Sequence, residues 1–193
     1  MRRHLGGAID RDAADKAARF LQLCDAFALP VVSLCDTPGF MVGPDAERTA
    51  TVRHFSRLFV TGANLSVPVV ALILRKAHGL GAMAMLGGST HAPATAAWPS
   101  GELGAMGLEG AVRLGYRKEL AAIADPGERD REYERLLAEL YDRGKAVNAA
   151  AAPEVDDVID PADSRRWITA ALDDRHTEPI PAGPKRRPFI DTW

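Results

Sequence analysis

The chain has 193 residues, of which 26 are Asp or Glu and 24 are Lys or Arg, and its formal net charge is −2. An apolar content of 47% and a charged content of 26% are typical of a globular domain, and the near-neutral charge argues against nucleic acid as a partner. Because no apolar run approaches the roughly 18 residues of a membrane helix and the first residues lack a secretory-signal pattern, we expect no membrane contact and a cytoplasmic location.

Strands and helices are expected to alternate along the first hundred residues. Apolar residues at helical spacing follow the capping residue Asp12, whereas residues 67–74 are apolar on both faces, as in the central strand of a parallel sheet. The expected elements are a helix over 12–27, a strand over 31–35, a helix from Asp45, a strand over 67–74, a helix over 82–86 and a strand over 94–98. This alternation predicts an α/β fold.

The character of the sequence changes at Gly107, after which helices dominate. Asp125 and Asp160 are each followed by proline, the pattern of a helix N-cap with proline at the first helical position. From His176 onward, four prolines without apolar periodicity indicate an extended tail. We therefore expect one domain over residues 1–175 and a tail over 176–193.

A glycine-rich turn is the strongest candidate for a functional site. Gly79 and Gly81 flank Leu80 where a strand passes into a helix. Such a turn lets a ligand approach the backbone, and the helix that follows offers unpaired N–H groups to an anion or a developing oxyanion. Spacing alone favours the alternative that the glycines serve a tight turn for steric reasons.

Side-chain chemistry is sparse elsewhere. Asp36–Gly39 imitates the γ-phosphate sensor of GTPases, but the chain has no phosphate-binding loop to accompany it. His78 stands alone, and we interpret it as structural. Cys24 and Cys35 are expected to be buried free thiols without metal-ligand spacing. The acidic residues near the end of the domain are interpreted as a solvated turn with a cap, so no metal is expected; they are Glu154, Asp156, Asp157 and Asp160.

Several segments, taken together and in order, resemble one enzyme family. They are Ala26–Pro30, Asp36–Phe40, Arg75–Ala82, Ala97–Pro99, Met106–Val112 and Asp157–Pro161 followed by Arg165. In this respect the chain is similar to the carboxyltransferase β subunits of biotin-dependent acyl-CoA carboxylases, of the acetyl- and propionyl-CoA type. The resemblance covers residues 6–175 and corresponds to the C-terminal half of those subunits only.

The resemblance implies a crotonase-type ββα superhelix, here a single C-terminal, biotin-side carboxyltransferase domain with added helices. It implies carboxyl transfer from carboxybiotin on a carrier protein to a coenzyme A thioester such as acetyl-CoA or propionyl-CoA. The expected partners are an N-terminal carboxyltransferase half, a biotin carboxyl carrier or biotin carboxylase subunit, and further copies of the chain. Without the N-terminal half we expect no turnover.

The resemblance also assigns roles to residues around the glycine-rich turn. The backbone N–H groups of Leu80 and Gly81 are expected to form the oxyanion hole for the ureido oxygen of biotin. The expected substrate-binding and biotin-binding residues are Thr37, Pro38, Gly39, Phe40, Gly79, Ala82 and Met83. Two alternatives stay open: a free-standing crotonase-type decarboxylase or hydratase, for which Glu102 and Glu109 are the nearby carboxylates, and a non-catalytic assembly module.

Overall fold

The computed structural model describes residues 4–87, 94–151, 154–173 and 190–191. Within them a five-stranded sheet has the order β1-β2-β3-β5, with β4 also pairing with β2, and every strand pair is parallel. The strands are β1 (Val31–Thr37), β2 (Val69–His78), β3 (Ala94–Ala97), β4 (Glu102–Gly104) and β5 (Asp157–Val158). The predicted α/β class and the central position of the long apolar strand are confirmed.

Strand β2 is longer than the sequence suggested. The predicted strand ended at Leu74, but the chain stays extended to His78 because Lys76–His78 pairs with β4. Strand β4 has only three residues, too few to show a period in the sequence. The polar residues at the end of β2 therefore belong to the sheet and deliver the chain directly into α4 (Gly79–Met85).

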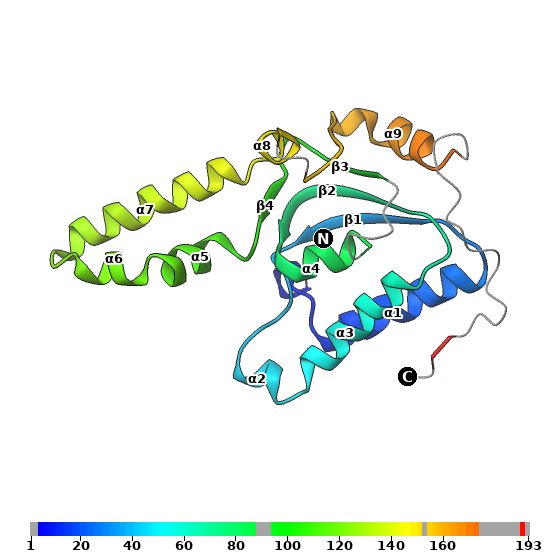
Figure 1. Cartoon of the computed structure of the whole chain (residues 1–193), viewed down its shortest axis with the longest axis horizontal. Coiled ribbons are helices and arrows are strands. Elements are labelled where there is room, and N and C mark those ends of the chain that lie inside the picture. The colour runs from blue at the N-terminus through cyan, green and yellow to red at the C-terminus, as the bar shows by residue number, and fades with distance from the viewer. Residues whose placement is uncertain (1–3, 88–93, 152–153, 174–189, 192–193) are drawn as a thin grey trace.

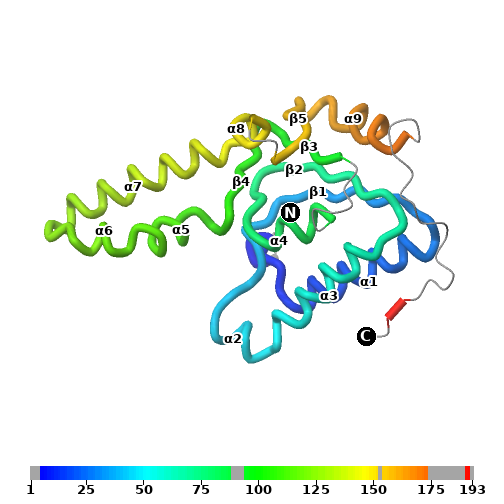
Figure 2. The backbone as a smooth tube through the Cα atoms, in the orientation of Figure 1, coloured from blue at the N-terminus to red at the C-terminus, as the bar shows by residue number. Residues whose placement is uncertain are grey.

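Helices lie on both faces of the sheet. Figure 1 shows α1 (Arg11–Ala26), α3 (Thr51–Ala63) and α4 on one side and α9 (Ser164–Ala171) on the other. The α9 residues Trp167 and Ile168 pack against Leu72 of β2 and Ala96 of β3. Figure 2 shows α9 beside β5, the strand at the far edge of the sheet from β1.

The first helix is capped by Asp10 and not by the predicted Asp12. The carboxylate of Asp10 accepts a hydrogen bond from the N–H of Ala13 at 2.8 Å. The helix buries Ala14, Ala18 and Cys24, whereas Phe20 and Phe27, which the sequence placed on its apolar stripe, are exposed. Small alanine side chains let α1 approach α3, where Ala18 packs against Leu58.

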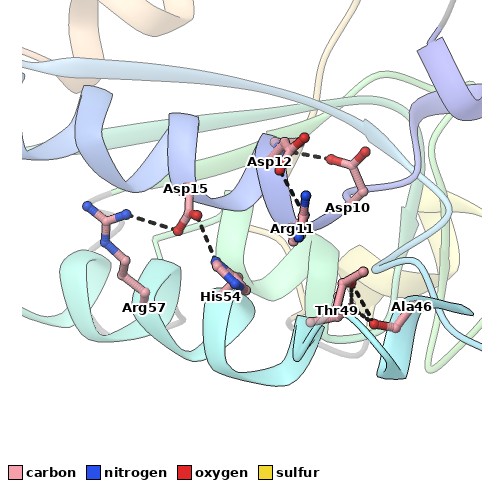
Figure 3. Close-up of polar contacts among 10 residues, drawn as sticks. Asp10, Arg11, Asp12, Asp15, Ala46, Thr49, His54 and Arg57 are labelled. Carbon is pink, nitrogen blue, oxygen red and sulfur yellow. Dashed lines mark hydrogen bonds and ion pairs between the residues drawn. The ribbon is translucent and has the colours of Figure 1, made fainter. Parts of the chain in front are cut away.

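A polar network also joins α1 to α3. Asp15 accepts from Arg57 at 2.9 Å and lies 2.7 Å from the Nδ1 atom of His54 (Figure 3). Arg57 also pairs with Asp191 at 3.0 Å, and Gln22 donates to the same carboxylate at 3.0 Å. Asp191 lies within the predicted tail, most of which falls outside the described residues, so the boundary at residue 175 stays a prediction.

The predicted second helix is interrupted. It divides into α2 (Pro44–Glu47) and α3 because Ala50 adopts a left-handed conformation with φ of 55°. The hydroxyl of Thr51 donates to the carbonyl of Ala46 across this break. Val52, which was expected on the buried stripe, is exposed as a result.

Helices α5 (Leu108–Gly115), α6 (Arg117–Ala122) and α7 (Pro126–Arg143) form an arm that projects from the sheet (Figure 1). Its core contains Val112, Leu120 and Leu136. The predicted cap of α7 is confirmed, since Asp125 accepts from the N–H of Glu128 at 2.7 Å. Helix α8 (Ala146–Ala151) returns the chain to the sheet, and no helix among the described residues is long and apolar enough to span a membrane.

Candidate functional site

The turn from β2 into α4 depends on Gly79. Its φ is 60°, a left-handed value that favours glycine, and a Cβ there would lie 3.0 Å from the carbonyl oxygen of Ala105. His78 precedes it as the N-cap of α4, in an extended conformation. The turn therefore brings α4 to the end of β2 beside the loop that follows β4.

Gly81 serves close packing on the other side of this turn. A Cβ on Gly81 would lie 2.7 Å from the carbonyl carbon of Gly39 and 2.8 Å from the backbone nitrogen of Phe40. The loop after β1 thus approaches α4 backbone to backbone. The steric interpretation of this glycine, which spacing alone favoured, therefore has a concrete structural basis.

The first turn of α4 carries free backbone donors. In an α-helix the N–H groups of the first residues have no acceptor within the helix, and these positions include Leu80 and Gly81. Among the described residues, neither group donates to an acceptor outside the helix. Residue Leu80 is 60% exposed, whereas Gly81 is buried. Position 80 is thus the more open of the two predicted donors.

A groove of about 820 Å³ opens beside this turn. Four residues of the predicted site line it, namely Gly79, Leu80, Ala82 and Met83. The opposite walls come from β4, α5 and the end of α7, which contribute Leu103, Leu108 and Leu140 among others. The turn and the helical arm, far apart in the sequence, therefore enclose one largely apolar space.

The other predicted substrate-binding residues do not line this groove. Thr37 is buried, and its hydroxyl donates to the carbonyl of Gly7 at 2.8 Å and accepts from the N–H of Gly39 at 3.1 Å. The ring of Phe40 stacks on Phe55 with centroids 3.8 Å apart. In this chain the loop from Thr37 to Phe40, which includes Pro38, supports α4 from behind, and its role toward biotin stays a prediction.

The groove also contains polar side chains that were not predicted to belong to the site. They are Arg143 at the end of α7, Asn148 on α8 and Glu154, which precedes β5 and was interpreted above as part of a solvated acidic turn. Asn148 donates to the carbonyl of Asp142 at 2.6 Å. No motif connected these residues with the glycine-rich turn, because their place beside Leu80 follows from the return of the helical arm to the sheet.

His78 lies behind the turn and is only 2% exposed. Neither of its ring nitrogens has a hydrogen-bond partner among the described residues. Burial lowers the pKa of this imidazole, and the positive charge of Lys76 lowers it further, while Glu102 and Glu109 act in the opposite sense. The ring is therefore held neutral and away from solvent, in keeping with its structural interpretation.

The two carboxylates considered for a hydratase lie outside the groove lining. Glu109 accepts a hydrogen bond from the hydroxyl of Tyr141 at 2.8 Å. Its backbone hydrogen bond and this contact lower the pKa of Glu109, and the same contact raises the pKa of Tyr141 to about 12. A carboxylate stabilised in its charged form is a poor proton donor, so this arrangement does not favour hydratase chemistry.

The acidic residues near the end of the domain have structural partners. Asp156 accepts from the N–H of Thr95 at 2.7 Å, and Asp160 accepts from the N–H of Ala162 at 2.8 Å as the predicted cap. This cap starts the 3-10 helix η2 (Pro161–Asp163) just before α9. Among the described residues, no group of three or more His, Cys, Asp or Glu side chains could hold a metal ion.

Comparison with known proteins identifies the family. The protein-family model described as the carboxyl transferase domain matches residues 1–189 of this chain. The chain belongs to the carboxyl transferase domain family. It is 40% identical over 173 residues to the methylmalonyl-CoA carboxyltransferase 12S subunit of Propionibacterium freudenreichii subsp. shermanii, covering 88% of this chain and 32% of that protein. It is 42% identical over 174 residues to a putative propionyl-CoA carboxylase beta chain of Bacillus subtilis, covering 88% of this chain and 33% of that one.

Solved structures agree with this assignment. A single-chain, multi-domain long-chain acyl-CoA carboxylase is 61% identical to this chain and superimposes on it with a TM-score of 0.77. The match covers 87% of this chain and 16% of that protein. The transcarboxylase 12S subunit, solved as a hexamer, is 37% identical with a TM-score of 0.81, over 96% of this chain and 35% of that one. The predicted crotonase-type α/β fold is confirmed. The chain spans about a third of the length of the curated relatives it matches.

Proposed function

We propose that this carboxyl transferase domain forms the biotin-side half of an acyl-CoA carboxyltransferase. The reaction moves a carboxyl group from carboxybiotin, carried on a separate protein, to a coenzyme A thioester of the acetyl- or propionyl-CoA type. The observation that carries the proposal is the 820 Å³ groove beside Leu80, in a chain that belongs to this family.

The groove suits the head group of biotin. Small-molecule sites typically enclose about 300–1,000 Å³ and are mostly apolar with a few polar groups. Here the apolar walls include Leu80, Met83 and Leu108, and the polar groups are the backbone donors of α4 and the side chains of Arg143 and Asn148. An apolar bicyclic ligand with one polar ureido edge matches such a lining.

In this proposal the chain contributes a backbone donor rather than an acid or a base. As the carboxyl group leaves biotin, negative charge develops on the ureido oxygen, and the N–H of Leu80 offers a preorganised donor to that charge. Gly79 sets the turn that presents this donor, and Gly81 allows α4 to sit against Gly39. A carboxylate buried in the groove would repel the same charge; among the described residues that line it, Glu154 is the one carboxylate, and it is exposed.

The proposal includes a partner, because the chain spans only about a third of its curated relatives. We expect the remaining carboxyltransferase half to hold the acyl-CoA against the groove. The names of two relatives support acyl-CoA and biotin as substrates: the 12S subunit is a methylmalonyl-CoA carboxyltransferase, and a Mycobacterium tuberculosis relative is called biotin-dependent.

The decisive experiment measures methylmalonyl-CoA-dependent or malonyl-CoA-dependent carboxylation of free biotin. The chain is assayed alone, with the N-terminal part of a carboxyltransferase β subunit, and with that part in the absence of the chain. Transfer only in the mixture supports the proposal. Equal transfer by the N-terminal part alone, or none in a mixture whose two chains co-elute on gel filtration, would reject it.

A further inference from the structure

Strands β1 and β2 change register shortly before the glycine-rich turn. Cys35 pairs with Ile73, an offset of 38 residues. Thr37 pairs with Ala77, an offset of 40. Between these pairs, Asp36 of β1 stands opposite a segment of β2, the bulge, which consists of Leu74, Arg75 and Lys76. Two extra residues of strand correspond to about 7 Å along the sheet, so the bulge decides where the end of β2 meets the loop after β1.

Side chains of β1 bind the bulge where the ladder between the two strands is interrupted. The carboxylate of Asp36 accepts from the N–H of Lys76 at 3.2 Å and from the Nε atom of Arg75 at 3.3 Å. The thiol of Cys35 donates weakly to the carbonyl of Lys76 at 3.8 Å. Burial raises the pKa of this thiol to about 12, so it stays protonated and able to donate. Both backbone groups of Lys76 are therefore bound by side chains of the neighbouring strand.

The other flank of the bulge is bound by the segment between β3 and β4. The carbonyl of Ile73 accepts from the N–H of Trp98 at 2.9 Å. The carbonyl of the next residue, Leu74, accepts from the hydroxyl of Ser100 at 2.7 Å. Consecutive carbonyls of a regular strand point to opposite neighbours, so two on one flank indicate the local disruption that a bulge makes. Here β2 exchanges its neighbour β3, paired as far as Ile73, for β4, which is paired from Lys76 and leads into the helical arm (Figure 1).

The bulge also determines the position of the turn that follows it. Directly after the bulge, β2 pairs again with Thr37, whose hydroxyl accepts from the N–H of Gly39 at 3.1 Å. Gly39 is the residue against which Gly81 packs backbone to backbone. The first turn of α4, with the N–H of Leu80, is therefore fixed relative to β1 by a path of contacts that begins at Asp36.

We propose that Asp36 is a positioning residue for carboxyl transfer, because by holding the bulge it places the N–H of Leu80 in the groove. The inference rests on the proposed function for the reaction that this donor serves. Bulges are common next to active sites, where they re-aim the residues around them. Asp36 lies outside the groove lining and acts through the backbone that it holds. The first residue of the segment that imitates a nucleotide sensor thus binds the protein's own chain.

The test compares Asp36→Ala with Asp36→Asn in protein labelled with nitrogen-15 leucine. The amide signal of Leu80 is followed by NMR, and hydrogen exchange of the β2 and β4 amides is followed by mass spectrometry. Asp36→Ala leaves the N–H of Lys76 without its acceptor, so we expect a shifted Leu80 signal and exchange over Lys76–His78 that is faster by about tenfold or more. Asp36→Asn keeps an oxygen for that N–H and should restore the wild-type signal and exchange.

Asp25→Ala is the matched control. Asp25 also accepts from a backbone N–H beside β2, that of Ser66 at 2.6 Å, but at the opposite end of the strand. This variant should lose stability in urea denaturation without moving the Leu80 signal or the exchange of the bulge. An equal shift in Asp25→Ala, no shift in Asp36→Ala, or failure of Asp36→Asn to rescue overturns the positioning role.

If Asp36→Ala does not fold, Ser100→Ala gives the answer from the other flank. Ser100 is exposed, and its hydroxyl holds the carbonyl of Leu74. Removing that hydroxyl should also speed exchange over Lys76–His78 and shift the Leu80 signal. Unchanged exchange and an unchanged signal in this variant overturn the proposal.

Kinetics in the mixture with the N-terminal part of a carboxyltransferase subunit separate this role from the proposed function. We expect Asp36→Ala to lower kcat by about tenfold or more and to leave KM for biotin within about twofold, because the donor acts on charge that develops in the transition state. Wild-type kcat in folded Asp36→Ala rejects the positioning role alone. No transfer in any mixture, together with the expected Leu80 shift, rejects the proposed function alone.

Discussion

Gly81 and Gly39 meet backbone to backbone, and a Cβ on Gly81 would come within 2.7 Å of the carbonyl carbon of Gly39. Real Cβ atoms do not approach backbone this closely, so a side chain here must displace either α4 or the loop after β1. The contact connects the strand-to-helix turn with the loop that the family resemblance had assigned to biotin. A substitution at Gly81 is therefore expected to lower the stability of the fold, whatever its effect on catalysis.

Gly81→Ala is expected to lower the free energy of unfolding by about 1–3 kcal/mol, the usual range for inserting a methyl group into a filled space. Gly110→Ala is the control, because a Cβ on that exposed helical glycine meets nothing within 4 Å. It should be neutral or stabilising by about 0.5–1 kcal/mol. Urea denaturation followed by circular dichroism measures both. Equal stability of the two variants would contradict the close packing.

Position 80 gives a cleaner test of the backbone donor than position 81, where a proline ring would also strike Gly39. Leu80→Pro removes the N–H in the first turn of α4, where the helix itself does not use it. In the reconstituted enzyme we expect the transfer rate to fall by about 10²-fold or more. Leu80→Ala keeps the N–H while removing most of the same side chain. If folded Leu80→Pro and Leu80→Ala lose rate equally, the donor role is wrong.

His78 should make the protein less stable in mild acid. Its pKa is lowered in the folded state by burial and by Lys76, whereas in the unfolded chain it lies near about 6.5. Below that pH the unfolded state binds a proton that the folded state does not. The free energy of unfolding therefore falls as the pH falls, by up to about 1.4 kcal/mol per pH unit. This loss ends when the pH reaches the lowered pKa of His78 in the folded state.

The variant His78→Phe isolates this effect. The ring nitrogens of His78 have no hydrogen-bond partner among the described residues. Replacing the imidazole with the apolar ring of phenylalanine therefore breaks no hydrogen bond to those residues. Urea denaturation at several pH values between about 5 and 7.5 should show a smaller acid-induced loss in the variant than in the wild type. Parallel curves for the two proteins would show that another group titrates.

The network around Asp15 should contribute measurably to stability. Asp15 is largely buried and contacts both His54 and Arg57, so Asp15→Ala leaves two polar groups without their shared acceptor. We expect a loss of about 1–3 kcal/mol in the free energy of unfolding. Asp12→Ala on the same helix removes an exposed carboxylate and should cost no more than about 0.5 kcal/mol. Similar costs for both variants would mean that the network is dispensable.

The sequence determined the elements whose cause is local. The apolar run of β2 predicted a central strand, because a strand covered on both faces of the sheet carries apolar side chains on both faces. The caps at Asp125 and Asp160 were readable because an N-cap bonds to residues two or three positions away. The ordered motifs from Ala26 to Pro161 also identified the family, since their combined spacing is far more specific than any one of them.

Only the tertiary structure decided which residues meet across the sheet and the arm. Lys76–His78 stays extended because β4, a three-residue strand without a visible period, lies beside it. The loop containing Phe40 supports α4 instead of lining the groove, because its ring has Phe55 to stack on. Arg143 joins the groove because the helical arm returns there. Such contacts depend on the path of the whole chain through space, which periodicity and spacing along the sequence do not encode.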